Sequence, residues 1–132
     1  MDYKGKVLVV DDEKDTRTFF TTLLSDQGYE VAEAENGVEA MEKLETFQPD
    51  LVTLDLSMPE KSGLGFYRDV REAGGDVPVI IITGIVSDMK QFIEKQRKVP
   101  PPEGYLGKPV DQKEMLALVE RLMKVDTNRQ PA

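Results

Sequence analysis

Five side chains that can bind cations or phosphate stand at the ends of predicted β-strands or shortly after them. They are Asp11, Asp12, Asp55, Thr83 and Lys108. Carboxylates that crowd together repel one another unless a cation lies among them, and oxygen-rich sites of this kind suit Mg²⁺. A carboxylate beside such an ion can attack phosphorus, while a hydroxyl and an ammonium group can hold the phosphoryl oxygens. The five residues therefore indicate a site for phosphoryl transfer.

Each of these residues also has a purely structural interpretation. Asp11 and Asp12, with the neighbouring Glu13, could cap the helix that follows, because negative charge is favourable at a helix N-terminus. Asp55 could form a turn, Thr83 could cap a helix and Lys108 could be an ordinary surface lysine. Their coincidence at the ends of successive strands is what favours a shared site.

The hydrophobic pattern alternates between strand-like and helix-like segments along the whole chain. Strands are predicted at residues 7–10, 29–34, 51–54, 77–83 and 105–106, and helices are predicted around residues 20–24, 38–47, 64–70, 89–93 and 115–123. Gly28, Pro49 and the prolines at 100–102 interrupt the helical patterns. This alternation predicts an α/β fold, with a doubly wound parallel sheet of five strands flanked by five helices. Ligands of such sheets bind beyond the carboxyl ends of the strands, where the five side chains lie.

Composition excludes several classes of chemistry. The chain has 132 residues, 17 basic and 25 acidic, with no cysteine and no histidine. Disulfides, thiol nucleophiles, Cys/His zinc sites and Ser-His-Asp triads are therefore excluded. A net charge of −8 disfavours direct binding to nucleic acid. The apolar runs are too short to insert into a membrane, so we expect a cytoplasmic protein with one domain at residues 1–125 and a polar tail at 126–132.

Four motifs, in order along the chain, resemble the receiver domain of two-component response regulators, the CheY-like superfamily. They are VLVVDDE at 7–13, DLSMP at 55–59 with Gly63, IIITG at 80–84 and YLGKP at 105–109. The resemblance covers about residues 5–124. It implies a flavodoxin-like fold with the sheet order 2-1-3-4-5.

The resemblance also implies a role for each residue of the site. Asp55 would accept a phosphoryl group from the phosphohistidine of a histidine kinase or a phosphotransfer protein. Asp12 would bind Mg²⁺ directly and Asp11 through water, with Asp55 and the backbone carbonyl of Ser57 as further ligands. The protein would then be a phosphoacceptor that promotes its own phosphotransfer and slow autodephosphorylation, and not an enzyme in the usual sense.

A second group of implied roles concerns the response to phosphorylation. Thr83 and Lys108 would hold the phosphoryl oxygens, with Lys108 before a cis bond to Pro109. Tyr105 would turn inward when Thr83 moves toward the phosphate. The face formed by the fourth helix, fifth strand and fifth helix (helix 4–strand 5–helix 5) would relay this state to a downstream effector or a second copy.

Two features modify this output face. The interval from Thr83 to Lys108 is longer than is usual for the family, and the three prolines at 100–102 favour extended backbone there. The segment 90–98 is predominantly basic and is either a solvated helix face or a docking patch for an acidic partner.

Two other functions remain open on the sequence. The chain could be a pseudo-receiver, an interaction module that no longer uses its pocket. It could also be an aspartate-nucleophile phosphohydrolase, but that class needs an Asp-x-Asp motif after the first strand. Here the second acid of that motif is replaced by Glu13, and the chain has no room for a cap domain.

Overall fold

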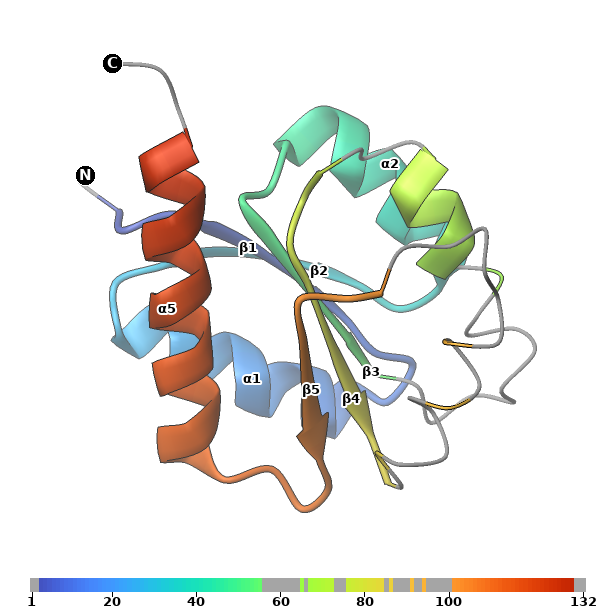
Figure 1. The fold of residues 1–132 in the computed structure, drawn as a ribbon. Helices are drawn as coiled ribbons and strands as arrows, with labels where there is room; N and C mark the ends of the chain where they lie inside the picture. Colours follow the sequence, from blue (N-terminus) through green and yellow to red (C-terminus); the bar gives the residue numbers. More distant parts are fainter. Residues whose placement is uncertain are drawn as a thin grey trace.

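Five parallel strands form the centre of the molecule (Figure 1). The computed structural model describes residues 3–55, 65, 67–72, 76–84, 86, 91, 94 and 101–129, with side chains described as far as residue 124. The strands are β1 (Lys6–Val10), β2 (Glu30–Ala34), β3 (Leu51–Asp55), β4 (Val79–Thr83) and β5 (Gly104–Gly107). Their order in the sheet is β2-β1-β3-β4-β5, which confirms the predicted topology.

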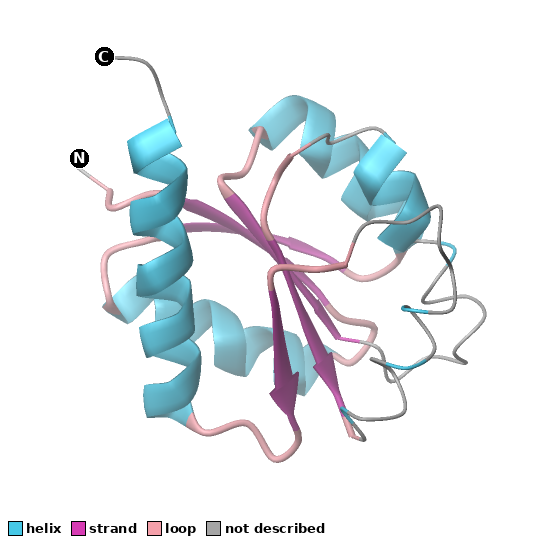
Figure 2. Cartoon of the chain, in the orientation of Figure 1, coloured by secondary structure: helices cyan, strands magenta, loops and turns pink. Residues whose placement is uncertain are grey.

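Helices cover both faces of this sheet (Figure 2). The helices with assigned bounds are α1 (Lys14–Asp26), α2 (Gly37–Phe47) and α5 (Gln112–Arg129). α1 and α5 lie on one face, and α2 lies on the other together with a helical segment at residues 67–72. Of the predicted fourth helix, only Val86, Gln91 and Glu94 are described, and these residues are helical. The fold is therefore the predicted doubly wound α/β architecture.

Successive strand residues contribute to two separate hydrophobic cores. Leu8, Val52 and Ile81 pack on the side of α2, whereas Val9 and Ile80 pack on the side of α1 and α5. The four apolar residues at 79–82 are all fully buried, as expected for a parallel strand that is covered on both faces. This double burial fixes β4 in the middle of the molecule and so fixes the position of its polar end.

Local signals end α1 and begin α2 as the sequence predicts. Gly28 has a φ of 97°, a left-handed conformation that favours glycine, and its N–H donates to the carbonyl of Ser25 at 3.0 Å. The side chain of Asn36 accepts a hydrogen bond from the Glu39 N–H at 2.9 Å and caps α2. These two helix caps determine where the connections on either side of β2 begin and end.

Several element boundaries differ from the prediction, including those of β4, β5 and α5. β4 begins at Val79 and not at residue 77, because Pro78 has no N–H to donate to a neighbouring strand. β5 is longer by one residue at each end. α5 continues to Arg129 and includes residues 126–129 of the predicted polar tail, since no glycine or proline occurs between Gln112 and Pro131. Among the helices that the structure describes, none has the length and apolarity needed to cross a bilayer.

Candidate functional site

The carboxyl ends of four strands bring four of the predicted side chains to one edge of the sheet. Asp11 directly follows β1, Asp55 is the last residue of β3 and Thr83 is the last residue of β4. Lys108 follows β5, and its backbone N–H donates to the carbonyl of Thr83 at 3.0 Å. Because neighbouring parallel strands end side by side, these side chains belong to one site.

Asp11 is a buried carboxylate fixed by hydrogen bonds. It is only 2% exposed, and its Oδ1 accepts a hydrogen bond from the Glu13 N–H at 2.8 Å. The pKa of Asp11 is raised to about 7, mainly by burial and in addition by the charge of the neighbouring Asp55, while the Glu13 hydrogen bond and the charge of Lys108 oppose this rise. The carboxyl group therefore lacks enough compensating positive charge in its surroundings.

Asp55 is paired with Lys108 at the same edge of the sheet. The Asp55 carboxylate is 2% exposed, and its Oδ1 lies 2.8 Å from the Lys108 Nζ. The second oxygen of each acid, Oδ2 of Asp11 and Oδ2 of Asp55, is buried and accepts no hydrogen bond from the part of the chain that the structure describes. Buried carboxylate oxygens without donors are unfavourable, so these two atoms favour a cation or a hydrogen-bond donor between them.

Thr83 and Pro109 complete the described wall of the site. Thr83 is 5% exposed and, as the last residue of β4, lies beside β5, where it is paired with Gly107. The Lys108–Pro109 peptide bond is cis, as the resemblance implied. Thr83 and Lys108 thus come from the ends of the strands on the far side of β3 from β1, and the Lys108 ammonium group reaches Asp55.

The predicted metal ligands are only partly assembled. Asp12 is exposed, and the described residues contain no cluster of three or more side chains that could hold a metal ion. Ser57 lies outside the described residues. The two unpartnered oxygens of Asp11 and Asp55 are nevertheless hard ligands, and Mg²⁺ commonly binds one or two carboxylates while it keeps several waters. This pair of carboxylates therefore fits Mg²⁺.

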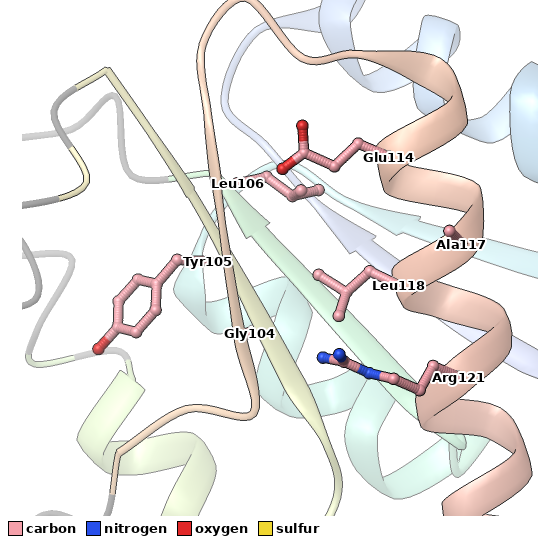
Figure 3. Close-up of a pocket in the computed structure, with 7 residues that line it drawn as sticks. All are labelled: Gly104, Tyr105, Leu106, Glu114, Ala117, Leu118 and Arg121. Atoms are coloured by element: carbon pink, nitrogen blue, oxygen red, sulfur yellow. The ribbon is translucent and has the colours of Figure 1, made fainter.

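Tyr105 extends from β5 toward the sheet face that carries the helical segment 67–72. Its ring points away from α5 (Figure 3) and packs against the hydrophobic core that contains Tyr67. Its hydroxyl is buried without a partner among the described residues. Burial, with smaller contributions from Tyr67 and Glu94, raises the pKa of Tyr105 to about 12. Tyr105, which was predicted as a switch, is thus partly buried, with its hydroxyl group turned into the interior.

A groove separates β5 from α5 on the other side of the strand. It has a volume of about 400 Å³, and Leu118 lies in it between Glu114 and Arg121 (Figure 3). Gly104 forms part of the wall, where a Cβ atom would come within 2.9 Å of the Leu118 side chain. A side chain at this position would therefore require the end of the Leu118 side chain to move.

Arg17 is a residue of this region that sequence analysis missed. Its Nη1 donates to the backbone carbonyl of Asp11 at 2.8 Å, and its Nε pairs with Glu33 at 3.0 Å. It thereby ties the turn after β1 to α1 and to β2. An arginine in the first turn of a helix carries no signal for this contact, because Glu33 belongs to a different strand.

Comparison with known proteins identifies the class to which this site belongs. The family model described as "Response regulator receiver domain" matches residues 7–120, and the chain belongs to this family. It is 34% identical over 119 residues to "Response regulator MprA" of Mycobacterium sp. (strain KMS), covering 90% of this chain and 50% of that protein. It is 36% identical over 123 residues to "Probable transcriptional regulator ycf27" of Porphyridium aerugineum, covering 92% of this chain and 49% of that protein.

Solved structures agree with this assignment. The receiver domain of the Francisella response regulator 1452 is 30% identical, with a TM-score of 0.78, and the match covers 92% of this chain and 98% of that one. A CheY-like receiver domain from Methanospirillum hungatei JF-1, 21% identical, has a TM-score of 0.82, covers 95% of this chain and 98% of that one, and supports the fold alone. The chain spans about half the length of the curated relatives it matches.

Proposed function

We propose that this receiver domain is switched by transfer of a phosphoryl group from the phosphohistidine of a histidine kinase, or of a phosphotransfer protein, to Asp55. The P–N bond of phosphohistidine breaks as a bond forms between phosphorus and a carboxylate oxygen of Asp55. The electron pair of the broken bond remains on the imidazole nitrogen, which takes a proton from water when needed. The product is an acyl phosphate on Asp55.

The observation that carries this proposal is the setting of the Asp55 carboxylate. It is almost completely buried, is paired through Oδ1 with Lys108 at 2.8 Å, and has a second oxygen without a hydrogen-bond donor among the described residues. That second oxygen is available as a nucleophile. Lys108 and Thr83 would then hold phosphoryl oxygens and stabilise the charge that develops during transfer.

Asp11, Asp12 and Asp55, together with the backbone carbonyl of Ser57, would hold Mg²⁺ at this edge of the sheet. When bound, the ion supplies positive charge that offsets the repulsion between carboxylates and phosphoryl oxygens. The raised pKa of Asp11 supports this assignment, because it reflects a carboxylate without sufficient local cationic charge.

A phosphorylation assay with a small acyl-phosphate donor tests the central claim. Intact protein incubated with acetyl phosphate and Mg²⁺ should gain the mass of one phosphoryl group, and Asp55→Asn should abolish the gain. Asp26→Asn, at an exposed position in the last turn of α1, is the matched control and should be modified like the parent. A folded parent protein whose mass does not change would contradict the proposal and favour the pseudo-receiver.

A phosphatase assay distinguishes a phosphohydrolase from a receiver. A receiver should show at most slow release of phosphate from its own acyl phosphate, whereas a phosphohydrolase should show continuous turnover of a phosphomonoester. Turnover of p-nitrophenyl phosphate at a steady rate would establish the enzyme.

The phosphodonor would dock beside Lys108. A hollow of about 190 Å³ adjoins this residue between α1 and the segment after β5, and Phe19 on its rim is 42% exposed. This apolar rim lies next to Lys108, which is paired with Asp55. It would suit a helical phosphodonor, because a helix docked there could bring its phosphohistidine close to Asp55. Phe19→Ala should therefore reduce phosphotransfer from a phosphorylated histidine kinase and leave modification by acetyl phosphate unchanged.

The output surface would include the groove between β5 and α5. Tyr105 and Leu106 of β5 contribute to its wall, so movement of the strand would change its shape. Glu114 and Arg121 provide one negative and one positive charge at its rim for a downstream effector or a second copy.

A further inference from the structure

A partly buried ion pair links the helical segment 67–72 to the start of β5. Arg71, whose side chain is 8% exposed, pairs through Nη2 with the Oε1 of Glu103. Its Nη1 donates to the carbonyl of Val77 at 2.6 Å and its Nε to the hydroxyl of Tyr67 at 3.0 Å. One guanidinium group therefore joins a helix, the segment before β4 and the residue before β5.

Glu103 uses the same oxygen to complete the hydrogen bonding of β4. Its Oε1 accepts from the Val79 N–H at 2.8 Å, while its own N–H donates to the Val79 carbonyl at 3.0 Å. A backbone N–H at the start of a parallel strand normally requires a main-chain carbonyl of the neighbouring strand. Here a carboxylate replaces that carbonyl, and Arg71 balances its charge. The pair thus fixes where β5 begins against β4.

The ion pair can affect the position of Tyr105 in two ways. Tyr105 is the second residue after Glu103, so its Cα position depends on where β5 begins. Its ring packs in the core that contains Tyr67, which is fully buried and whose hydroxyl Arg71 holds. The Arg71 guanidinium also lies 5.2 Å from the centroid of the Tyr67 ring. The strand that carries Tyr105 and the ring beside it are thus held by the same group.

We propose that the Arg71–Glu103 ion pair positions Tyr105 in its interior orientation and thereby favours the phosphorylated conformation. The inference rests on the proposed function and on the expectation from the sequence that Tyr105 turns inward on phosphorylation. A group remote from the site can change ligand affinity only by stabilising one conformation more than another. Arg71 and Glu103 are therefore positioning residues, and they contact neither the phosphoryl group nor the metal.

The first test measures the position of Tyr105 directly, without any ligand. Arg71→Lys keeps the positive charge but cannot make the three directed contacts of the guanidinium. Nitration by tetranitromethane, followed by peptide mass spectrometry, should modify Tyr105 several-fold faster in Arg71→Lys than in the parent. Tyr3, 47% exposed, provides an internal standard of full reactivity. Arg68→Lys, at an exposed position in the same helical segment, is the matched control and should leave Tyr105 unchanged.

The second test measures the affinity for beryllofluoride in the presence of Mg²⁺ by calorimetry. Arg71→Lys and Glu103→Gln should each weaken binding about tenfold, within the usual range of coupling between sites, while the affinity for Mg²⁺ alone stays unchanged. Glu103→Gln keeps an oxygen for the Val79 N–H and so serves as the milder variant. In a Tyr105→Ala background, neither substitution should weaken beryllofluoride binding further.

Three results would overturn the inference. Folded variants that bind beryllofluoride like the parent would show that the ion pair has only a structural role. A loss of affinity that persists in Tyr105→Ala would show that the effect bypasses Tyr105. Unchanged nitration of Tyr105 in Arg71→Lys would refute the positioning itself. Failure of the parent to bind beryllofluoride would contradict the proposed function, and the nitration assay would still decide whether the ion pair positions Tyr105.

Discussion

Asp11 and Asp55 are two acidic residues that lie buried at one edge of the sheet. Each has an oxygen without a hydrogen-bond donor among the described residues, and Lys108 pairs only with Asp55 among the ion pairs of that part of the chain. Such an arrangement favours function at the expense of stability, since a buried carboxylate without sufficient compensation destabilises the folded state.

The stability of the metal-free protein should therefore decrease as the pH rises from about 4 to about 7. The pKa of Asp11 is raised from 3.8 to about 7 in the folded protein, so in this window the folded state keeps a proton that the unfolded state has released. The stabilising effect of that proton is complete below the lower pKa and disappears above the higher one. Urea unfolding in EDTA across this range measures the slope.

Asp11→Asn should remove this pH dependence and increase the free energy of unfolding by about 2 kcal/mol at about pH 8 in EDTA. Mg²⁺ should then stabilise the parent more than the variant. Asp26→Asn, at an exposed position, should behave like the parent. An Asp11→Asn variant that is less stable than the parent in EDTA would contradict this prediction. It would show that hydrogen bonds and nearby positive charge already compensate the burial of the Asp11 carboxylate.

Thr53 presents a second unsatisfied group in the interior. It is 1% exposed, and its hydroxyl has no hydrogen-bond partner in the described part of the protein. Thr53→Val keeps the shape of the side chain and removes the buried hydroxyl, so the free energy of unfolding should increase by about 1 kcal/mol. Thermal and urea unfolding provide the measurement.

Thr46→Val is the matched control for that substitution. Thr46 is exposed, and its hydroxyl donates to the carbonyl of Glu42 at 3.0 Å, so the change should bring no gain in stability. Equal gains in both variants would indicate a general effect of valine and not a buried hydroxyl at Thr53.

At the level of elements, the turn from α1 to β2 depends on one backbone conformation. Gly28 has a φ of 97°, and the N–H of Tyr29 returns to the carbonyl of Leu24 at 3.2 Å. This closure aligns β2 with β1, where Glu30 pairs with Lys6. The position of Asp11 depends on it as well, because the Asp11 N–H donates to the carbonyl of Ala34 at the end of β2.

Gly28→Ala should destabilise the protein by about 1 kcal/mol or more, because a Cβ atom is strained in the left-handed region. Gly65→Ala is the contrasting variant. Gly65 is helical and has open space around its Cβ position, so alanine there should be neutral or stabilising. Chemical denaturation should therefore show changes in the free energy of unfolding that differ in sign or size between the two variants. Equal changes would contradict the role of Gly28.

The strands, and therefore the polar residues at their ends, could be predicted because each strand has its own local hydrophobic pattern. The apolar run at 79–82 predicted a strand buried on both faces, and the structure confirms it. The start of β5 could not be predicted, since it depends on Glu103 and Arg71, which are 32 residues apart. Partners so distant in sequence leave no periodic pattern, and only the assembled sheet brings them together.

The same distinction applies to the site. Sequence alone indicated which side chains gather at the sheet edge, and the structure brings together Asp11, Asp55 and Lys108. It did not indicate that Asp12 is exposed, because the direction of a side chain after a strand depends on the turn that follows. The metal-binding role of Ser57 stays a prediction, as does the division of the chain at residue 125.

For the whole molecule, the excess of acidic residues should make stability depend on salt. A net charge of −8 implies repulsion across the surface, which dissolved ions screen over about 10 Å at about 0.1 M. Raising NaCl from about 0.02 to about 0.2 M should increase the free energy of unfolding near neutral pH by up to about 1 kcal/mol. The gain should vanish near the isoelectric point of about 4.6. A decrease with salt at neutral pH would mean that attractive pairs outweigh the repulsion.

The strand β5, one of the two edge strands of the sheet, has consequences for self-association. It is four residues long, and prolines at 102 and 109 lie close to its two ends. Proline has no N–H, so a strand from another molecule could form only a few main-chain hydrogen bonds with this edge strand. Growth of amyloid-like stacks from this edge is thereby disfavoured, because the two prolines limit how far the strand can be extended.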